Sequence, residues 1–189
     1  MKKIMKISLV AAILASFANA AVYEVDAAHT NVSFKVKHLS ISKVNGNFGK
    51  FSATIDYDKS SNTLKTFEAS IDATSINTQN ETRDNHLRSA DFFDTAKFEK
   101  ITYKMMKFEK ESPTEGKVVG TLTMHGVTKP VVLKFELGGF SKDQDGKEKI
   151  GFSLEGHTKR SLFEIGLDTS DLTISDKVEL EIEVEAKER

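Results

Sequence analysis

"TNVSFKVKH", residues 30–38, alternates apolar and polar side chains without a break. Val32, Phe34 and Val36 fall on one side of an extended chain together with His38, and polar side chains fall on the other. Because successive side chains of a β-strand point to opposite faces, a period of two is typical of a strand that is buried on one face only. The stretch therefore predicts a half-buried strand.

The same alternation recurs along most of the chain. The positions predicted to share the inner face with Phe34 and Val36 are Phe51, Ile55, Phe67, Ile71, Ile101, Tyr103, Leu122, Met124, Leu133, Phe135, Phe152 and Leu154. Turn-rich segments separate the runs, among them the Asp-Gly hairpin signal "DQDG" at residues 143–146. Many strands at short spacing, without an internal repeat or linker, predict one all-β domain that is either an antiparallel barrel or a sandwich.

The amino terminus reads as a targeting segment. A basic head, "MKKIMK", precedes the apolar run "ISLVAAILASF" and the small residues "ANA". This pattern predicts a secretory signal, residues 1–20, that is cleaved after Ala20, because the apolar run is shorter than the roughly 20 residues of a transmembrane helix. The expected mature domain is residues 21–189, without a transmembrane anchor.

The composition excludes several classes of function. Without the three lysines of residues 1–20, 24 of the 27 basic residues remain against 28 acidic ones, a formal net charge of −4. A nucleic-acid partner is not expected, because phosphate-binding surfaces carry a basic excess. The chain has no cysteine, so it has no thiol nucleophile and no thiolate metal site.

A membrane-spanning barrel would turn the apolar faces toward lipid instead. The last strand pattern then places Glu179, Glu181, Glu183 and Glu185 in a narrow lumen, where carboxylates lack water and partners. The chain also has no Trp and only three Tyr for two aromatic girdles. The apolar faces are therefore expected to point inward.

Residues 80–94, "NETRDNHLRSADFFD", are where the alternation fails. They predict a short helix near residues 80–90, on which Asp84 and Arg88 can pair at the surface because they are four residues apart. Leu87 and the Phe92–Phe93 pair are the groups expected to be buried.

The sequence offers little evidence for catalysis or metal binding. The five histidines have no HxH or HxxxH spacing, and no nucleophile motif is present, so no catalytic residue, metal or cofactor is expected. His38 is the exception, because it ends an inward-facing run. Its ring either bonds a backbone carbonyl or meets the polar head of a bound amphiphile.

Four stretches taken together resemble the YceI-like family of exported bacterial proteins. They are "YEVDAAHTNVSFKVKHLSISKVNGNFGKF" (23–51), "INTQNETRDNHLRSADFFDTAKF" (76–98), "GTLTMHGVTKPVVL" (120–133) and "LEIEVEAKE" (180–188). The resemblance implies a single antiparallel, lipocalin-like β-barrel of about eight strands in the periplasm. It also implies that the lumen holds a polyisoprenoid, a quinone-like chain or another long-chain amphiphilic lipid, lined by the inner-face residues named above.

The resemblance also extends to individual positions. Arg83, His86, Phe92 and Phe93 match the family's run near the barrel mouth, and His38 matches a recurrent position, so these five are the expected head-group or mouth residues. One segment departs from the family. Where members commonly carry R-x-D-F-G, "RSLFEIG" (160–166) has Leu162 and Glu164 in place of Asp and Gly.

Three hypotheses stay open at this point. The first is a non-enzymatic carrier with a hollow lumen, which small inward residues such as Gly120 favour. The second is an enzyme that acts on a lipid-like or quinone substrate with His38 or His86 as general acid or base. The third is a structural or partner-binding barrel whose core is filled. A homodimer is open in each case.

Overall fold

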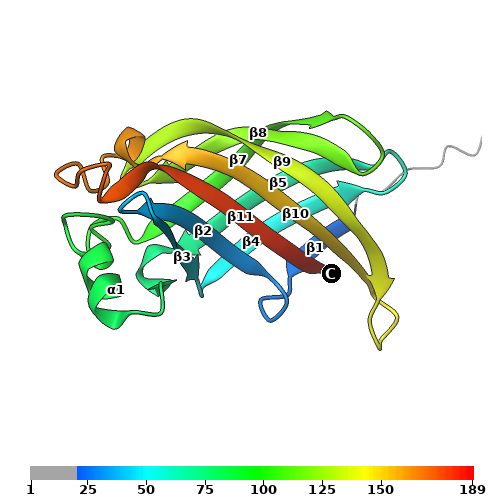
Figure 1. Cartoon of the computed structure of the whole chain (residues 1–189). Helices are drawn as coiled ribbons and strands as arrows, with labels where there is room; N and C mark the ends of the chain where they lie inside the picture. The colour runs from blue at the N-terminus through cyan, green and yellow to red at the C-terminus, as the bar shows by residue number, and fades with distance from the viewer. Residues whose placement is uncertain (1–20) are drawn as a thin grey trace, which may run out of the picture.

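A computed structural model describes residues 21–189 (Figure 1), and the predicted signal, residues 1–20, lies outside the described residues. The strands are β1 (Ala21–Val25), β2 (Asn31–His38), β3 (Ser42–Phe48), β4 (Phe51–Asp58), β5 (Thr63–Asp72), β6 (Ile76–Asn77), β7 (Lys100–Lys110), β8 (Glu115–Met124), β9 (Val127–Lys142), β10 (Glu148–Lys159) and β11 (Ile174–Glu188). The helices are η1 (Ala73–Ser75), α1 (Glu81–Arg88) and η2 (Arg160–Phe163). Within this range, no helix has the length and apolar character needed to cross a bilayer.

The sheet closes on itself through β11. One edge of β11 pairs with β10, and the other edge pairs with β2 near its start and with β1 near its end. β2 and β1 lie end to end along β11 and together form one bent strand of the wall. β3, which pairs with β2, and β4, which pairs with β1, likewise form the next bent strand. The result is a closed antiparallel barrel of eight strands with one short α-helix, which confirms the predicted fold.

The carboxylates of β11 lie on the outside of the barrel. Glu181 binds the Lys35 ammonium of β2 at 2.6 Å. Glu185 binds Lys149 of β10 at the same distance. The apolar positions of the alternating strands form the buried core instead. The inward orientation expected from the sequence is therefore confirmed.

Aromatic rings fill the half of the barrel that lies toward the β4–β5 and β9–β10 turns. Tyr57, Phe67, Phe135 and Phe152, called here the aromatic plug, are each less than 5% exposed. The ring centroids of Phe135 and Phe152 are 5.2 Å apart, and those of Phe67 and Phe152 are 6.1 Å apart in an edge-to-face arrangement. These strands lie far apart in the sequence, so the barrel closure brings the rings together.

Tyr103 forms the inner surface of the plug. Its ring lies 6.0 Å from that of Phe67, and its hydroxyl donates to the carbonyls of Val118 (2.9 Å) and Val131 (3.1 Å). Burial raises the pKa of this phenol, which keeps the donor protonated. A Cβ at Gly120 would lie 2.6 Å from the Tyr103 oxygen. The expectation that Gly120 leaves the lumen hollow is therefore wrong, because Tyr103 occupies that space.

The turn between β4 and β5 depends on an ionised carboxylate. Asp58 accepts hydrogen bonds from the hydroxyls of Ser60 (2.6 Å) and Ser61 (2.7 Å). These bonds hold the pKa of the Asp58 carboxyl well below its usual range. The stabilisation is therefore present above the ordinary pKa of Asp and is lost as the pH falls through the lowered value.

Replacement of Asp58 by Asn is expected to lower the melting temperature near neutral pH by on the order of a few degrees. The difference from the wild type should shrink in strong acid, where Asp58 itself becomes protonated. Thermal unfolding followed by circular dichroism at both pH values measures this. The exposed Asp168→Asn is the control. A difference that is the same at both pH values would contradict the assignment.

Candidate functional site

The other half of the barrel holds a cavity of about 690 Å³, between the aromatic plug and α1. This volume lies within the range of about 300–1,000 Å³ that is typical of small-molecule sites. Its apolar walls include Val32, Phe34, Val36, Val44, Phe48, Ile71, Ile101, Tyr103, Leu122, Met124, Leu133, Val178, Leu180 and Ile182. The interior is thus neither a tunnel along the whole barrel nor a filled core.

Fourteen residues were expected to line the lumen, and the structure divides them into two groups. Those that line the cavity are Phe34, Val36, Ile71, Ile101, Tyr103, Leu122, Met124 and Leu133. Those that do not are Phe51, Ile55, Phe67, Phe135, Phe152 and Leu154. All of the second group except the half-buried Phe51 belong to the packed core, because they lie at the plugged depth of the barrel.

Phe34 shows how the chain shapes the cavity wall. Its register partner on β3 is Gly46, and a Cβ at Gly46 would lie 2.3 Å from the Phe34 ring. The ring therefore lies flat over the neighbouring strand, 5.7 Å from the ring of Phe48. Phe48 in turn meets Phe93 edge-to-face at 6.1 Å. This row of aromatic rings joins the barrel wall to the segment after α1.

Polar side chains gather where the cavity meets the surface. All five residues expected at the mouth, namely His38, Arg83, His86, Phe92 and Phe93, line the cavity. Asn80, Thr82 and Thr173 join them there and are exposed. The site therefore has an apolar depth and a polar rim, although the binding roles of these residues stay a prediction.

The helix α1 is fixed over the mouth by its own side chains. Asn80 is its N-cap and accepts from the Arg83 amide at 2.9 Å. The buried Asp84 accepts from the amide of Thr78 at 2.9 Å and also from its hydroxyl. Arg83 donates through Nε to the Thr78 hydroxyl (2.7 Å) and through Nη2 to the Thr78 carbonyl (2.8 Å).

The predicted surface pair between Asp84 and Arg88 is wrong. Asp84 turns inward to Thr78, because the two groups of Thr78 give it two hydrogen bonds away from water. Arg88 donates to the carbonyls of Thr74 and Ile76, each at 2.8 Å. Arg88 therefore joins the end of α1 to the segment before it.

The two histidines at the cavity do not converge with an acid. His86 lies 3.3 Å from the carboxylate of Asp91, but both groups are exposed and Asp91 does not line the cavity. Among the cavity-lining residues of the described chain, no two titratable side chains lie within hydrogen-bond distance of each other. Within the cavity, the described residues therefore form no direct contact between an acid and a base.

Arg160 is a cavity residue that no sequence pattern singles out. It is 6% exposed and donates to the carbonyls of Ile165 (3.1 Å), Gly166 and Thr169 (2.7 Å), and it binds Asp171 at 2.8 Å. Each acceptor belongs to the segment 164–173 between η2 and β11. Only the resemblance to the family could have pointed to this arginine, because its partners are mostly backbone carbonyls.

The departure from the family pattern falls on a strained position of the same segment. Glu164 ends η2 with a φ of 59°, in the left-handed region. Glycine adopts this conformation without the steric cost that a Cβ brings. The turn therefore keeps its shape with glutamate, but at some cost in backbone strain.

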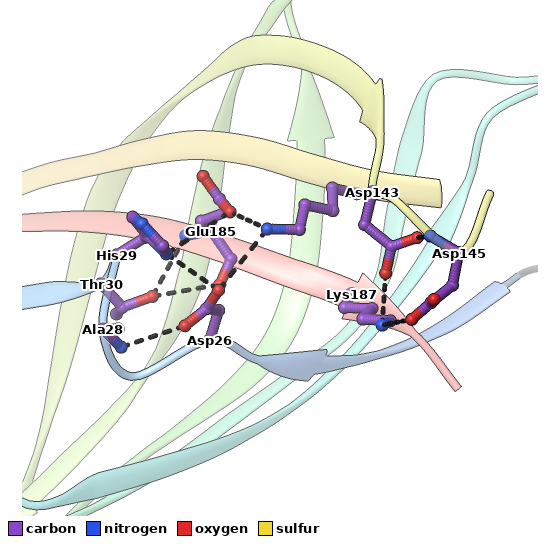
Figure 2. A network of polar contacts seen from close by, with 9 residues as sticks. Asp26, Ala28, His29, Thr30, Asp143, Asp145, Glu185 and Lys187 are labelled. Atoms are coloured by element: carbon purple, nitrogen blue, oxygen red, sulfur yellow. Dashed lines mark hydrogen bonds and ion pairs between the residues drawn. The ribbon is translucent and has the colours of Figure 1, made fainter. Parts of the chain in front are cut away.

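Outside the cavity, Figure 2 shows a polar network that joins the β1–β2 turn to β11. Asp26, His29 and Glu185 bring two carboxylates and an imidazole within 4.8 Å of one another. The Lys149 ammonium already lies 2.6 Å from Glu185 and 3.6 Å from Asp26. The hydrogen bond to Glu185 raises the pKa of Lys149, so the lysine already supplies a positive charge to this cluster.

Known proteins share this fold and part of the sequence. A crystal structure of a Campylobacter jejuni YceI protein has 52% sequence identity and a TM-score of 0.77, and the match covers 87% of this chain and 96% of that one. A polyisoprenoid-binding domain from Saccharophagus degradans has the same fold, with 17% identity, a TM-score of 0.67 and a match over 90% of this chain and 99% of that one.

Sequence comparison extends the likeness to the whole barrel. A UPF0312 protein of Staphylococcus aureus strain N315 is 39% identical over 165 residues, which cover 85% of this chain and 94% of that protein. Residues 23–186, from the middle of β1 to near the end of β11, match the YceI-like domain. On this evidence the chain belongs to the YceI-like family.

Proposed function

We propose that this protein binds one long-chain amphiphilic lipid, a polyisoprenoid or a quinone-like molecule, in the cavity between the aromatic plug and α1. The observation that carries the proposal is a cavity of about 690 Å³ with apolar walls and a polar rim. An apolar tail gains about 0.8 kcal/mol for each buried methylene group before the costs of binding are subtracted. A polar head then remains at the rim, near His38, Arg83 and His86.

Membership of the family supports this ligand class. A structural neighbour, the Saccharophagus degradans domain, is described as polyisoprenoid-binding, and the chain shares its barrel. The signal predicted for residues 1–20 supports a periplasmic location, where a carrier keeps an apolar molecule away from water. Both the ligand and the compartment belong to the proposal.

The proposed role is to carry or sequester the ligand rather than to convert it. An enzyme would need an acid and a base that reach the same atoms of a substrate. Arg83 is held by Thr78, and His86 points to the exposed Asp91. Binding therefore has more support than catalysis.

Mass spectrometry of organic extracts tests the proposal, on mature protein purified without detergent. A long-chain lipid is expected at about one molecule per protein. Phe34→Asp should abolish this lipid, because a carboxylate in an apolar wall is costly to bury. The outer-face variant Lys35→Gln should retain it, since the lost Lys35–Glu181 pair is a surface ion pair worth at most about 1 kcal/mol.

A second cavity variant separates lost binding from lost folding. Val36→Trp places a larger apolar side chain in the void and introduces no charge, so the protein should melt close to the wild-type temperature while retaining less lipid. An empty extract from the wild type, or equal lipid in the wild type and in both cavity variants, would contradict the proposal.

A further inference from the structure

Exposed aliphatic side chains gather at one end of the barrel. Of the eight large hydrophobic residues that are exposed in the described part of the chain, five lie at the mouth end, namely Leu39, Ile41, Leu162, Leu167 and Leu172. The most exposed are Ile41 (86%) and Leu172 (74%). Single exposed hydrophobic residues are ordinary on a protein surface, but a group of them marks an interaction site.

Two neighbouring loops carry these five residues. Leu39 and Ile41 form the tip of the β2–β3 turn, and the other three lie between β10 and β11. Figure 1 shows both loops at the end of the barrel that carries α1, and the Leu39 amide donates to the Thr173 carbonyl at 3.0 Å. Because Thr173 also lines the cavity, the apolar tips stand directly beside its mouth.

The β2–β3 turn carries a charge that suits a phospholipid surface. The β2–β3 turn is flanked by Lys37 and Lys43, which face each other across the hairpin, and it contains no acidic residue. The Lys43 ammonium binds Glu179 at 3.0 Å. Lys37 is therefore the lysine of this turn that can keep its ammonium group at the level of lipid phosphates while the aliphatic tip enters the apolar layer. The second loop carries Glu164 and Asp168, which oppose adhesion, and Asp171, which Arg160 neutralises.

We infer that these two loops dock the barrel on the surface of a phospholipid bilayer, with the tip of the β2–β3 turn inserted and the cavity mouth facing the lipid. Because Glu179 already binds Lys43, and Glu164 and Asp168 oppose the charge of Lys37, apolar insertion drives the contact. The apolar tips enter the lipid without passing through it, and the interaction is reversible.

The choice of a bilayer over a protein partner rests on the proposed function. A long-chain lipid has to leave a membrane and return to one, and a mouth that touches the bilayer lets its tail move between the two without crossing water. The apolar side chains also stand on two loops directly beside the cavity mouth, where a lipid tail would enter.

Flotation with vesicles tests the inference. Mature protein is mixed with phosphatidylethanolamine vesicles that contain phosphatidylglycerol, and the fraction that floats with the vesicles is measured. The wild type is expected to float, and the double variant Ile41→Ser/Leu172→Ser should lose binding by about tenfold or more. The control, Met106→Ser/Val132→Ser, removes two exposed aliphatic side chains from the barrel wall and should float like the wild type.

Three results would overturn the inference. The wild type fails to float, the mouth variant floats as well as the wild type, or the wall control loses as much binding as the mouth variant. Sedimentation without vesicles adds a fourth: if the wild type is a dimer and the mouth variant is a monomer, the tips bind a second copy of this chain.

The lipid content of the same samples distinguishes the two proposals. Protein that carries lipid but does not float contradicts only the docking. Protein that floats but carries no lipid contradicts only the proposed function of the cavity.

Discussion

Replacement of Phe67 by alanine is expected to lower the free energy of unfolding by about 3–5 kcal/mol, the usual cost of truncating a buried phenylalanine. Phe67 is 4% exposed and contacts both Phe152 of the aromatic plug and Tyr103 at the cavity floor. Its removal leaves a void directly beyond Tyr103. The variant should therefore also select a longer ligand, because the cavity can extend into the plugged half of the barrel.

Urea denaturation measures the first effect, and mass spectrometry of extracted lipid measures the second. Phe67→Leu keeps most of the side-chain volume, and it replaces the alanine variant in both measurements if that variant does not fold. Phe51→Ala is the matched control, because Phe51 is half-buried and lies outside both the plug and the cavity. A variant that is destabilised as expected but retains the wild-type chain length would contradict the role of the plug in limiting the ligand.

Replacement of Arg160 by methionine is expected to release the segment between η2 and β11. The guanidinium satisfies several carbonyls of residues 165–174, and each buried acceptor that loses its partner costs about 1–3 kcal/mol. We expect the free energy of unfolding to fall by about 3 kcal/mol, because water can reach some of these carbonyls once the segment moves. Lipid retention should fall as well, since Ile165 and Ile174 lie on the cavity wall.

Hydrogen exchange resolved by residue is the most direct measurement, because amides in residues 164–174 should lose protection while those of the plug strands keep it. Arg160→Lys retains the charge but not the planar fork of donors, and it should fall between the wild type and the methionine variant. The neighbouring exposed Lys159→Met serves as the control. Wild-type protection in Arg160→Met would show that the segment holds its shape without the arginine.

These two variants probe different parts of one design. In the plugged half, buried aromatic rings pack against one another and stabilise the barrel. In the open half, the apolar walls surround an unfilled cavity, which lowers the stability until a bound lipid tail supplies the missing contacts. Loss of stability is therefore expected from both variants. A change in ligand length is expected only from Phe67→Ala, and loss of loop protection only from Arg160→Met.

The sequence by itself determined the strands and their inward faces, and its resemblance to the YceI-like family selected a barrel over a sandwich. Alternation with a period of two assigns each strand residue to a face, and this assignment holds for Phe34, Lys35 and Val36 in β2 and for the outward Glu181 and Glu185 of β11. The break in alternation at residues 80–94 located α1, because helix-forming residues replace the strand pattern there. Both signals are local, so they can be read without knowing which strands meet.

Only the tertiary structure decided which half of the barrel is hollow. Alternation fixes the face of a residue but not its depth along the barrel axis, so Phe34 at the cavity and Phe152 in the plug look alike in the sequence. Depth depends on the register between strands and on the rings that closure brings together. The role of Arg160 also depends on the tertiary structure, because its guanidinium binds backbone carbonyls. Every residue has a backbone carbonyl, so the sequence does not show which ones an arginine will bind.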